Sequence, residues 1–336
     1  MTMRGFFLTS VIHLIAAILV VWVLRPGASG IEGLFSVITD ALVSVIALGL
    51  ILAQQKTWIL IPVVALILFG VFINRSRFLP VMYATMGIFL LQAGFALMKG
   101  SITLILPFWA DIPLANIDKA LHGIDPWMWV FSAPEWMKNL AVRFGPALYT
   151  SGWAIPALGF PVLVAATDQN DARVRRSMIL YVFCWLGIGT VFATLGSSAG
   201  PVFLDRLTET DRFSGLIAAL SSSGLSETSI GMTQNALWSG YSTGNAAIGI
   251  SAFPSVHLAI STVAAIYLGE RRRWLIPFGV AFVVAILFMS VFSGYHYAVD
   301  GYASIILVIF TWSILRNRLT ANGEEPPKER PKTGRL

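Results

Sequence analysis

The 336-residue chain contains a single cysteine, Cys184, in the apolar string YVFCWLG. A lone cysteine excludes an internal disulfide and a thiolate metal cluster, so we expect Cys184 to pack among apolar side chains. Charged residues are also scarce, at 12% of the chain, compared with about 25% in a typical soluble domain. The sequence has no Walker loop, dinucleotide-binding fingerprint or internal repeat, which leaves nucleotide-driven transport without support.

Hydrophobic residues, in contrast, make up 56% of the chain. Nine apolar runs approach the roughly 20 residues that a helix needs to cross a bilayer. They lie near 6–24, 33–53, 57–74, 80–99, 145–166, 177–196, 252–269, 275–292 and 297–315. Barrel strands would alternate polar and apolar residues, so we expect an all-α polytopic membrane protein with about nine transmembrane helices. The first run resembles a signal peptide in its Arg4 flank, but its apolar core is longer than is usual for one.

The arginines predict the orientation of the chain. Arginine-rich segments occur at 75–77, at 173–176, at 271–273 and from Arg316 onward. Alternation of the last six runs places them all on one side, and basic short loops mark the cytoplasm. Residues 100–144 and 197–251 then face outward, to the periplasm if the membrane is a bacterial inner membrane, or to a lumen. Alternation through all nine runs also places the N-terminus outside. The net charge of +6 reflects this topology, and we expect no nucleic-acid partner.

Two of the four histidines begin helices on the outer side. His257 lies in FPSVHLA and His296 in GYHYAVDGY, and the 39 residues between them correspond to two membrane crossings plus a tight turn. Both rings should therefore lie at the same depth. Asp300 follows His296 by four residues, so its carboxylate can accept the ring N–H on the same helix face. For His13 and His122 we expect hydrogen-bonded interfacial roles.

These residue types are suited to phosphoryl transfer. A histidine held by an aspartate is fixed in one tautomer and made more nucleophilic, and a second histidine can protonate a leaving oxygen. The Ser255 hydroxyl and the amides at the helix start suit a phosphate. We therefore predict a phosphohistidine mechanism that requires no metal and no cofactor. A zinc site of His257, His296 and Asp300 is an alternative by ligand type. Ser255 is disfavoured as a nucleophile, because the sequence does not show a general base and an orienting residue arranged in order to activate it.

The strings FPSVHLA and GYHYAVDGYAS resemble the second and third signature motifs of the type 2 phosphatidic acid phosphatase superfamily. These membrane enzymes cleave or transfer lipid phosphoesters. The resemblance implies a six-helix core with His296 as nucleophile, Asp300 as its partner and His257 as acid. Further segments look like the branch of inositol phosphorylceramide synthases and related inositolphosphotransferases; they lie at 116–130, 145–164 and 197–207.

The chain is accordingly divided into three parts. Residues 1–78 form N-terminal transmembrane helices, 79–315 a catalytic core similar to that family, and 316–336 a polar, proline-rich tail that we expect to be disordered in the cytoplasm. Tryptophans at 109, 127, 129, 136, 153 and 238 are expected in an interfacial belt, with a lipid entrance as the alternative.

Two departures from the family pattern concern phosphate-clamping arginines. The Lys-x6-Arg-Pro motif of the superfamily is not found, since the nearest string, KNLAVRFGP, has Gly145 at the arginine position. Ser290 stands where an arginine six residues before the nucleophile is usual. Synthase-like branches share these losses, which favours a transferase. Lys138, Arg143, Arg206 and Arg212 are candidate counter-charges. The predicted substrate-binding residues are Ser255, Gly200, Pro201, Lys138 and Arg143.

The sequence thus predicts a lipid phosphotransferase that moves a phospho-head group, for example phosphoinositol, to an alcohol or ceramide-like acceptor at the outer face. Both lipids would enter from the bilayer. A phosphatase of lipid phosphates or polyprenyl pyrophosphates is the alternative. A proton-coupled transporter could use the same residues as a relay, but ionisable groups near the midplane and repeated halves would be expected of it. A non-enzymatic membrane scaffold is a further alternative, but it would not need His257, His296 and Asp300 to lie close together.

Overall fold

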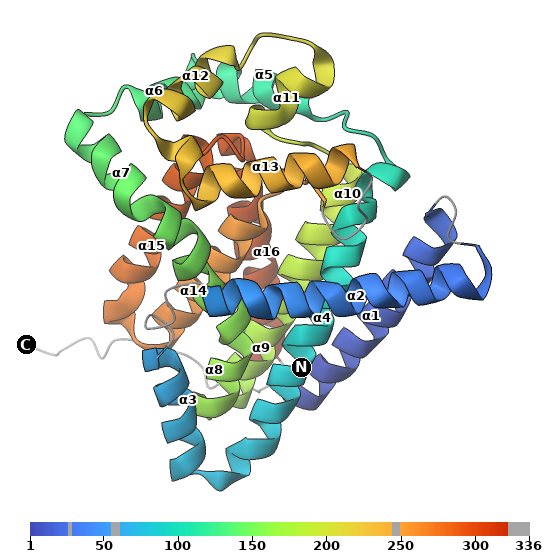
Figure 1. Cartoon of the computed structure of the whole chain (residues 1–336). Helices are drawn as coiled ribbons and strands as arrows, with labels where there is room; N and C mark the ends of the chain where they lie inside the picture. The colour runs from blue at the N-terminus through green and yellow to red at the C-terminus, as the bar shows by residue number, and fades with distance from the viewer. Residues whose placement is uncertain (26–28, 55–60, 244–248, 322–336) are drawn as a thin grey trace, which may run out of the picture.

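The computed structural model describes residues 1–25, 29–54, 61–243 and 249–321. All regular structure in this part of the chain is helical (Figure 1). The long elements are α1 (Met3–Leu24), α2 (Gly30–Gln54), α3 (Ile61–Ile73), α4 (Phe78–Ile105), α7 (Glu135–Ala147), α8 (Phe160–Thr167), α9 (Asp171–Val182), α14 (Val256–Arg271), α15 (Ile276–Phe292) and α16 (Ala298–Ala321).

Six of the described helical segments are long and apolar enough to cross a membrane, which makes this an all-α polytopic membrane protein, as predicted. They are Met3–Leu24, Arg75–Ile105, Glu135–Thr167, Asp171–Leu195, Arg273–Phe292 and Ala298–Arg318. Three expected crossings are not among them. The helices α3 and α14 have 13 and 16 residues, and α2 runs across the other long helices in Figure 1. The predicted run 57–74 begins outside the described residues.

Two of the six segments contain wide helical turns. The α7–α8 segment passes through the π-helical stretches η3 (Leu148–Gly152) and η4 (Ile155–Gly159). The segment that begins with α9 continues through the π-helical η5 (Phe183–Phe192) into α10 (Ala193–Leu195). Turns of this kind are rare and are frequently found at functional sites.

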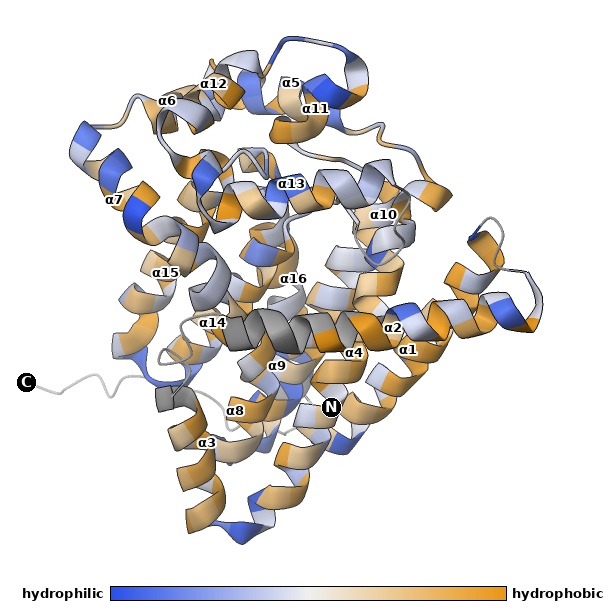
Figure 2. Cartoon of the chain, in the orientation of Figure 1, coloured by the Kyte–Doolittle hydropathy of each residue, from blue (hydrophilic) through white to orange (hydrophobic). Residues whose placement is uncertain are grey.

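Short helices form a layer over one end of the bundle (Figure 1). They are α5 (Asp111–His122), α6 (Pro126–Phe131), α11 (Pro201–Thr208), α12 (Ser214–Ser222) and α13 (Ser229–Ser242). Hydrophilic residues are frequent in this layer, whereas the long helices below it are mostly hydrophobic (Figure 2). The described parts of the predicted outward segments 100–144 and 197–251 thus lie together at one end.

The arginine-rich loops meet at the opposite end, around Asp168. Arg173 Nη2 lies 2.6 Å from Asp168 Oδ1, and Arg271 Nη1 lies 3.6 Å from Asp168 Oδ2. Arg77 Nη1 donates to the Asp168 carbonyl at 2.8 Å. Burial acts to raise the pKa of Asp168, but the hydrogen bonds from Arg173 and the Asn170 N–H, together with the Arg173 charge, outweigh it and the net shift is downward. The structure therefore places these loops on one side, as the arginine pattern predicts.

The N-terminus lies at the same end, where the Met1 amine donates to the Arg175 carbonyl at 3.5 Å. The expectation that it lies opposite the arginine loops is wrong, because α2 crosses the bundle obliquely and does not add a further parallel crossing (Figure 1). Instead, α1 packs along α4, with Phe6 and His13 against Gly87 and Gly94. An added Cβ would lie 2.7 Å from Phe6 and 2.8 Å from His13, so both glycines permit this contact.

The described residues also refine three smaller predictions. Cys184 is fully buried in the apolar core, as expected. His122 is hydrogen-bonded on both ring nitrogens, Nδ1 to the Asp118 carbonyl at 2.7 Å and Nε2 to Tyr302 Oη at 3.0 Å. The α16 helix extends to Ala321 and so includes the start of the predicted disordered tail, of which 322–336 lies outside the described residues. The three-part division of the chain stays a prediction.

Candidate active site

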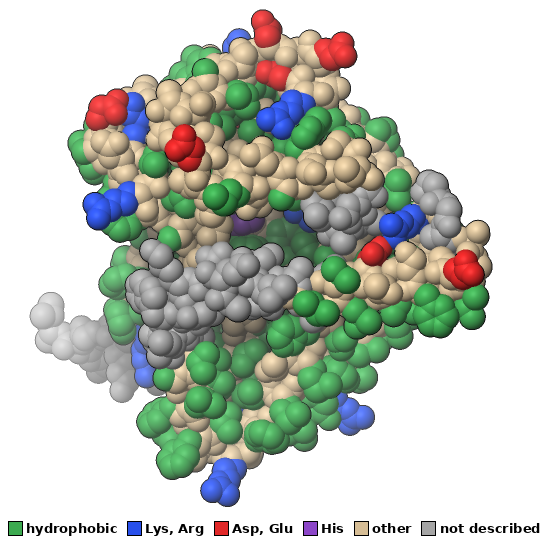
Figure 3. All heavy atoms as spheres, viewed as in Figure 1, with side chains coloured by type: hydrophobic (Ala, Val, Ile, Leu, Met, Phe, Trp, Pro, Cys, Tyr) green, Lys and Arg blue, Asp and Glu red, His purple; other side chains and the backbone are tan. Residues whose placement is uncertain are grey.

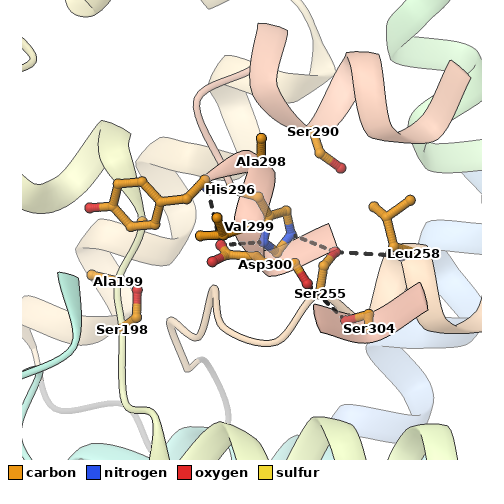
Figure 4. Close-up of polar contacts among 12 residues, drawn as sticks. Ser198, Ala199, Ser255, Leu258, Ser290, His296, Ala298, Val299, Asp300 and Ser304 are labelled. Atoms are coloured by element: carbon orange, nitrogen blue, oxygen red, sulfur yellow. Dashed lines mark hydrogen bonds and ion pairs between the residues drawn. The ribbon is translucent and has the colours of Figure 1, made fainter. Parts of the chain in front are cut away.

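His296 is the centre of a chain of polar side chains between α14 and α16 (Figure 4). Its Nδ1 lies 3.3 Å from Asp300 Oδ2, and its Nε2 lies 3.3 Å from Ser255 Oγ. Ser255 is the N-cap of α14, where its hydroxyl accepts the Leu258 N–H at 3.5 Å. The structure thus shows the serine–histidine–aspartate order that the sequence argument against Ser255 did not find. That argument is wrong, since the fold places Ser255 on the free nitrogen of His296.

Asp300 is fixed by its own helix start. Its Oδ2 also accepts the Tyr297 N–H at 3.0 Å, while Oδ1 has no hydrogen-bond partner among the described residues. The N-terminus of α16 is capped from elsewhere, since Asp118 of α5 accepts the Ala298 and Val299 N–H groups at 2.8 and 3.0 Å. Burial raises the pKa of Asp118, against the opposing effect of these two donors. Asp300 is therefore left to orient His296.

His257 is held by aromatic rings and not by a carboxylate. Its ring stacks on Trp153 at a centroid distance of 3.9 Å and on Tyr149 at 4.4 Å. The Trp153 indole also donates to the His257 carbonyl at 3.1 Å. Tyr149 belongs to η3, and Trp153 directly follows it. The wide turn thus presents two rings to His257, and Trp153 is not part of the predicted interfacial belt.

The two histidines face one cavity of about 370 Å³. Their ring centroids are 6.0 Å apart, so the predicted convergence of His257 and His296 is observed. Figure 3 shows a histidine side chain in a hollow of the molecular surface below α13. The cavity walls come from α4, from the π-helical segments, from α13 and from the loops before α14 and α16.

Lys99 of α4 also lines this cavity, and sequence reasoning missed it. Its side chain makes no hydrogen bond or ion pair with any described residue. Lys99 is half-buried, and an ammonium withdrawn from water without a carboxylate partner is costly unless an anion arrives with the ligand. Lys99 is therefore the cation best placed to neutralise a phosphate beside the two histidines.

The cations proposed from the sequence are occupied elsewhere. Lys138 pairs with the exposed Glu135 at 2.5 Å, and Arg212 pairs with Asp125 at 2.9 Å. Arg143 lies over the Phe144 ring at 5.2 Å, and Arg206 over the Trp238 ring at 5.3 Å. None of these four lines the cavity of the histidines.

Gly200, predicted with Pro201 to bind substrate, forms a packing contact within the protein. The Gly200 N–H donates to Asp111 Oδ1 at 2.8 Å, so a carboxylate of the protein already occupies this position. Gly200 has a φ of +93°, and an added Cβ would lie 2.3 Å from the Tyr295 carbonyl oxygen. Only glycine permits this approach. The pair thus supports the loop that carries His296.

Ser290, at the position of the missing arginine, is buried in α15. Its Oγ lies 3.3 Å from Tyr149 Oη, and its carbonyl accepts the His296 N–H at 3.3 Å. The position therefore connects the ring that stacks on His257 with the backbone of His296, and it carries no charge. Within the described residues, no group of three or more His, Cys, Asp or Glu side chains is arranged to hold a metal ion.

A family model described as the PAP2 superfamily matches residues 114–314, which is more than half of the chain. The chain belongs to the PAP2 superfamily. Comparison with curated proteins and with solved structures found no match. PAP2 membership supports a phosphatase or phosphotransferase that acts on lipid phosphoesters in the bilayer.

Membership in the PAP2 superfamily also changes the interpretation of Lys99. Six residues separate Lys99 from Leu106 and Pro107, so the string has the form Lys-x6-Leu-Pro. The full Lys-x6-Arg-Pro motif is still not found in the sequence, but this string is nearer to it than the one around Lys138. Two of its three positions are kept, N-terminal to the matched segment, and leucine replaces the arginine. A search that left the arginine position open would have found Lys99.

Proposed function

We propose that the protein is a lipid phosphotransferase that works through a phosphohistidine at His296. One observation carries the proposal: His296, His257 and Lys99 line a single cavity, and Asp300 lies on the far nitrogen of His296. The set provides a nucleophile, an acid and a cation, the three groups that phosphoryl transfer without a metal requires.

In the first step, His296 Nε2 attacks the phosphorus of the lipid phosphoester. Asp300 Oδ2 accepts a hydrogen bond from the Nδ1–H and, as a carboxylate, stabilises the phosphoimidazolium that forms. The Ser255 hydroxyl, 3.3 Å from Nε2 in this structure, turns away from that nitrogen and frees it for attack. Lys99 neutralises charge on the phosphoryl group, and His257 protonates the departing alkoxide.

In the second step, His257 accepts a proton from an incoming hydroxyl group, which attacks the phosphohistidine. An alcohol gives a new phosphoester, whereas water releases the phospho-head group from a diester donor or free phosphate from a monoester donor. Two features favour an alcohol as acceptor. The two usual arginine positions are Leu106 and Ser290, and the cavity wall includes apolar and aromatic side chains such as Phe95, Leu158 and Trp185.

The acceptor is tested with purified protein and lipid phosphoesters labelled in the phosphate or head group. We expect that inositol-containing donors and ceramide-like or other alcohol acceptors increase label in new lipid above label released to water. Hydrolysis with no gain from any alcohol would contradict the transferase and support the phosphatase alternative. The branch of inositolphosphotransferases is part of this proposal.

The order Ser255–His296–Asp300 favours a second candidate, an acyl hydrolase in which Ser255 is the nucleophile. Three observations weigh against it. Ser255 is fully buried, it does not line the cavity, and its hydroxyl already caps α14. A serine-directed fluorophosphonate distinguishes the two, since stable labelling of wild type that is lost in Ser255→Ala would support the hydrolase.

We further propose that the layer of short helices and the cavity face the outside of the membrane. The support is the set of arginine-rich loops around Asp168 at the other end of the bundle, since such loops mark the cytoplasm.

A further inference from the structure

A buried amide in the same cavity lacks a hydrogen-bond partner. Gln92 of α4 lines the cavity, and its Nε2 is inaccessible and unpaired among the described residues. A buried amide donor without a partner is destabilising, and nearly all such groups in folded proteins are satisfied. The mechanism above does not use Gln92. A small rotation that brings this amide to the cavity surface would let a ligand group supply the missing partner.

The position of Gln92 shows which part of a ligand it meets. Gln92 and Lys99 are seven residues apart on α4, which places them on one face and about 10 Å apart along the axis. Leu158 and Trp185 line the cavity too. Along their helical segments, Leu158 lies further than Tyr149 from the layer of short helices, and Trp185 lies further than Gly189 from it. The cavity thus runs from the reacting histidines and Lys99 toward apolar walls, with Gln92 at the deeper end.

A lipid bound with its phosphate at Lys99 and His296 would place its next few atoms beside Gln92. In acyl lipids these atoms include the carbonyl oxygen of an ester or amide linkage, which accepts hydrogen bonds. In polyprenyl phosphates they are hydrocarbon, which leaves the Gln92 amide buried and unpaired. The two lipid classes therefore differ at the position of this side chain.

We infer that Gln92 forms a polar subsite that donates a hydrogen bond to an acyl carbonyl oxygen of the lipid phosphoester. The inference rests on the proposed function, because the position of the phosphate defines the depth of the linkage. It makes Gln92 a specificity residue that selects ester- or amide-linked lipids over polyprenyl phosphates.

Binding of non-hydrolysable phosphonates to the purified full-length protein tests this without turnover. A diacylglycerol phosphonate and a dialkyl-ether phosphonate differ only in the ester carbonyl, and an N-acylsphingosine phosphonate carries an amide carbonyl on a different backbone. We expect wild type to bind at least one carbonyl probe about tenfold more tightly than the ether, the effect of one hydrogen bond to a buried amide. Whether the ester or the amide is preferred identifies the linkage.

Gln92→Met keeps the length of the side chain and removes its amide. The ratio of the Kd of the ether probe to that of the carbonyl probe should therefore fall to about one, while the Kd of the ether probe changes little. Leu158→Met is the control, since a volume-conserving change in the apolar wall should leave the ratio intact. Equal binding of all probes by wild type, or a preference that persists in Gln92→Met, overturns the inference. A wild-type preference without any turnover would instead contradict the proposed function and leave the subsite standing.

Discussion

Lys99 is the residue whose role follows most directly from its surroundings. It lies in the cavity with His257 and His296, and no described carboxylate pairs with it. We predict that Lys99→Met lowers kcat/KM by about 10- to 100-fold, because a charge-assisted hydrogen bond to phosphate is lost. Steady-state kinetics of the purified variant measure this.

Lys138→Met is the matched control for that experiment. Lys138 pairs with exposed Glu135 outside the cavity, so its removal should leave kcat/KM within about twofold, as expected for a surface ion pair. Equal losses in the two variants would show that Lys99 has no special role in phosphate binding.

Trp153 should act on the reaction through His257. We predict that Trp153→Leu lowers turnover by about tenfold, since loss of the stacking leaves the His257 ring free to turn. The loss should be smaller for a substrate with a low-pKa leaving group, which needs less protonation. Parallel assays with both substrates check this. A variant that loses both activities equally would indicate a structural role only.

His257, His296 and Asp300 could be predicted from their spacing, because two crossings return the chain from His257 to the depth of His296. The four-residue spacing also predicted the contact between His296 and Asp300, although His296 lies in the loop before α16 and not on the helix itself. Lys99 could not be recognised in the same way, because Leu106 replaces the arginine that would have marked its motif. Gly200 was misread, since its steric role against Tyr295 appears only when the chain is folded.

At the scale of elements, the π-helical segments could not be predicted from the sequence. Apolar periodicity places a helix over 145–166, but it does not distinguish an α-helical turn from the wider turn of η3 that presents Tyr149 to His257. The supporting role of α5 was equally hidden. Asp111 and Asp118 hold the segments that carry Gly200 and the start of α16, and these contacts span many residues of sequence.

The loop between α8 and α9 gives a prediction on stability. Asp168 is fully buried and holds Arg173 and Arg271. We expect Asp168→Asn to destabilise the protein by about 1.5–3 kcal/mol at pH 7, the contribution of hydrogen bonds to a charged group. Thermal unfolding in detergent micelles, compared with wild type, measures the change.

The difference in stability between wild type and Asp168→Asn should depend on pH with a definite sign. The folded pKa of Asp168 is lowered from 3.8, so the unfolded chain binds the proton more tightly and stability rises with pH in this range. The contribution is fully present well above pH 3.8 and is lost as the pH falls through the folded pKa. Wild type and Asp168→Asn should converge in acid. A constant difference across this range would exclude the ionised carboxylate as its source.

At the scale of the whole molecule, the arrangement predicts which residues share a side of the membrane. Ser221 in α12 and Arg272 after α14 lie at opposite ends, and Thr2 lies at the end of the arginine loops. In a background without Cys184, a cysteine at 221 should react with an impermeant reagent in sealed cells. Cysteines at 2 and 272 should react only after permeabilisation. Labelling of position 272 from outside would contradict the proposed orientation.

The central claim is that His296 carries the phosphoryl group between donor and acceptor. Rapid quenching of purified protein with a lipid phosphoester labelled in the transferred phosphoryl group tests it most directly. We predict acid-labile, base-stable label on wild type, as expected for phosphohistidine, and none on His296→Ala. Ser255→Ala should still be labelled, though more slowly. Label that persists on His296→Ala, or acid-stable label that disappears only in Ser255→Ala, would contradict the account.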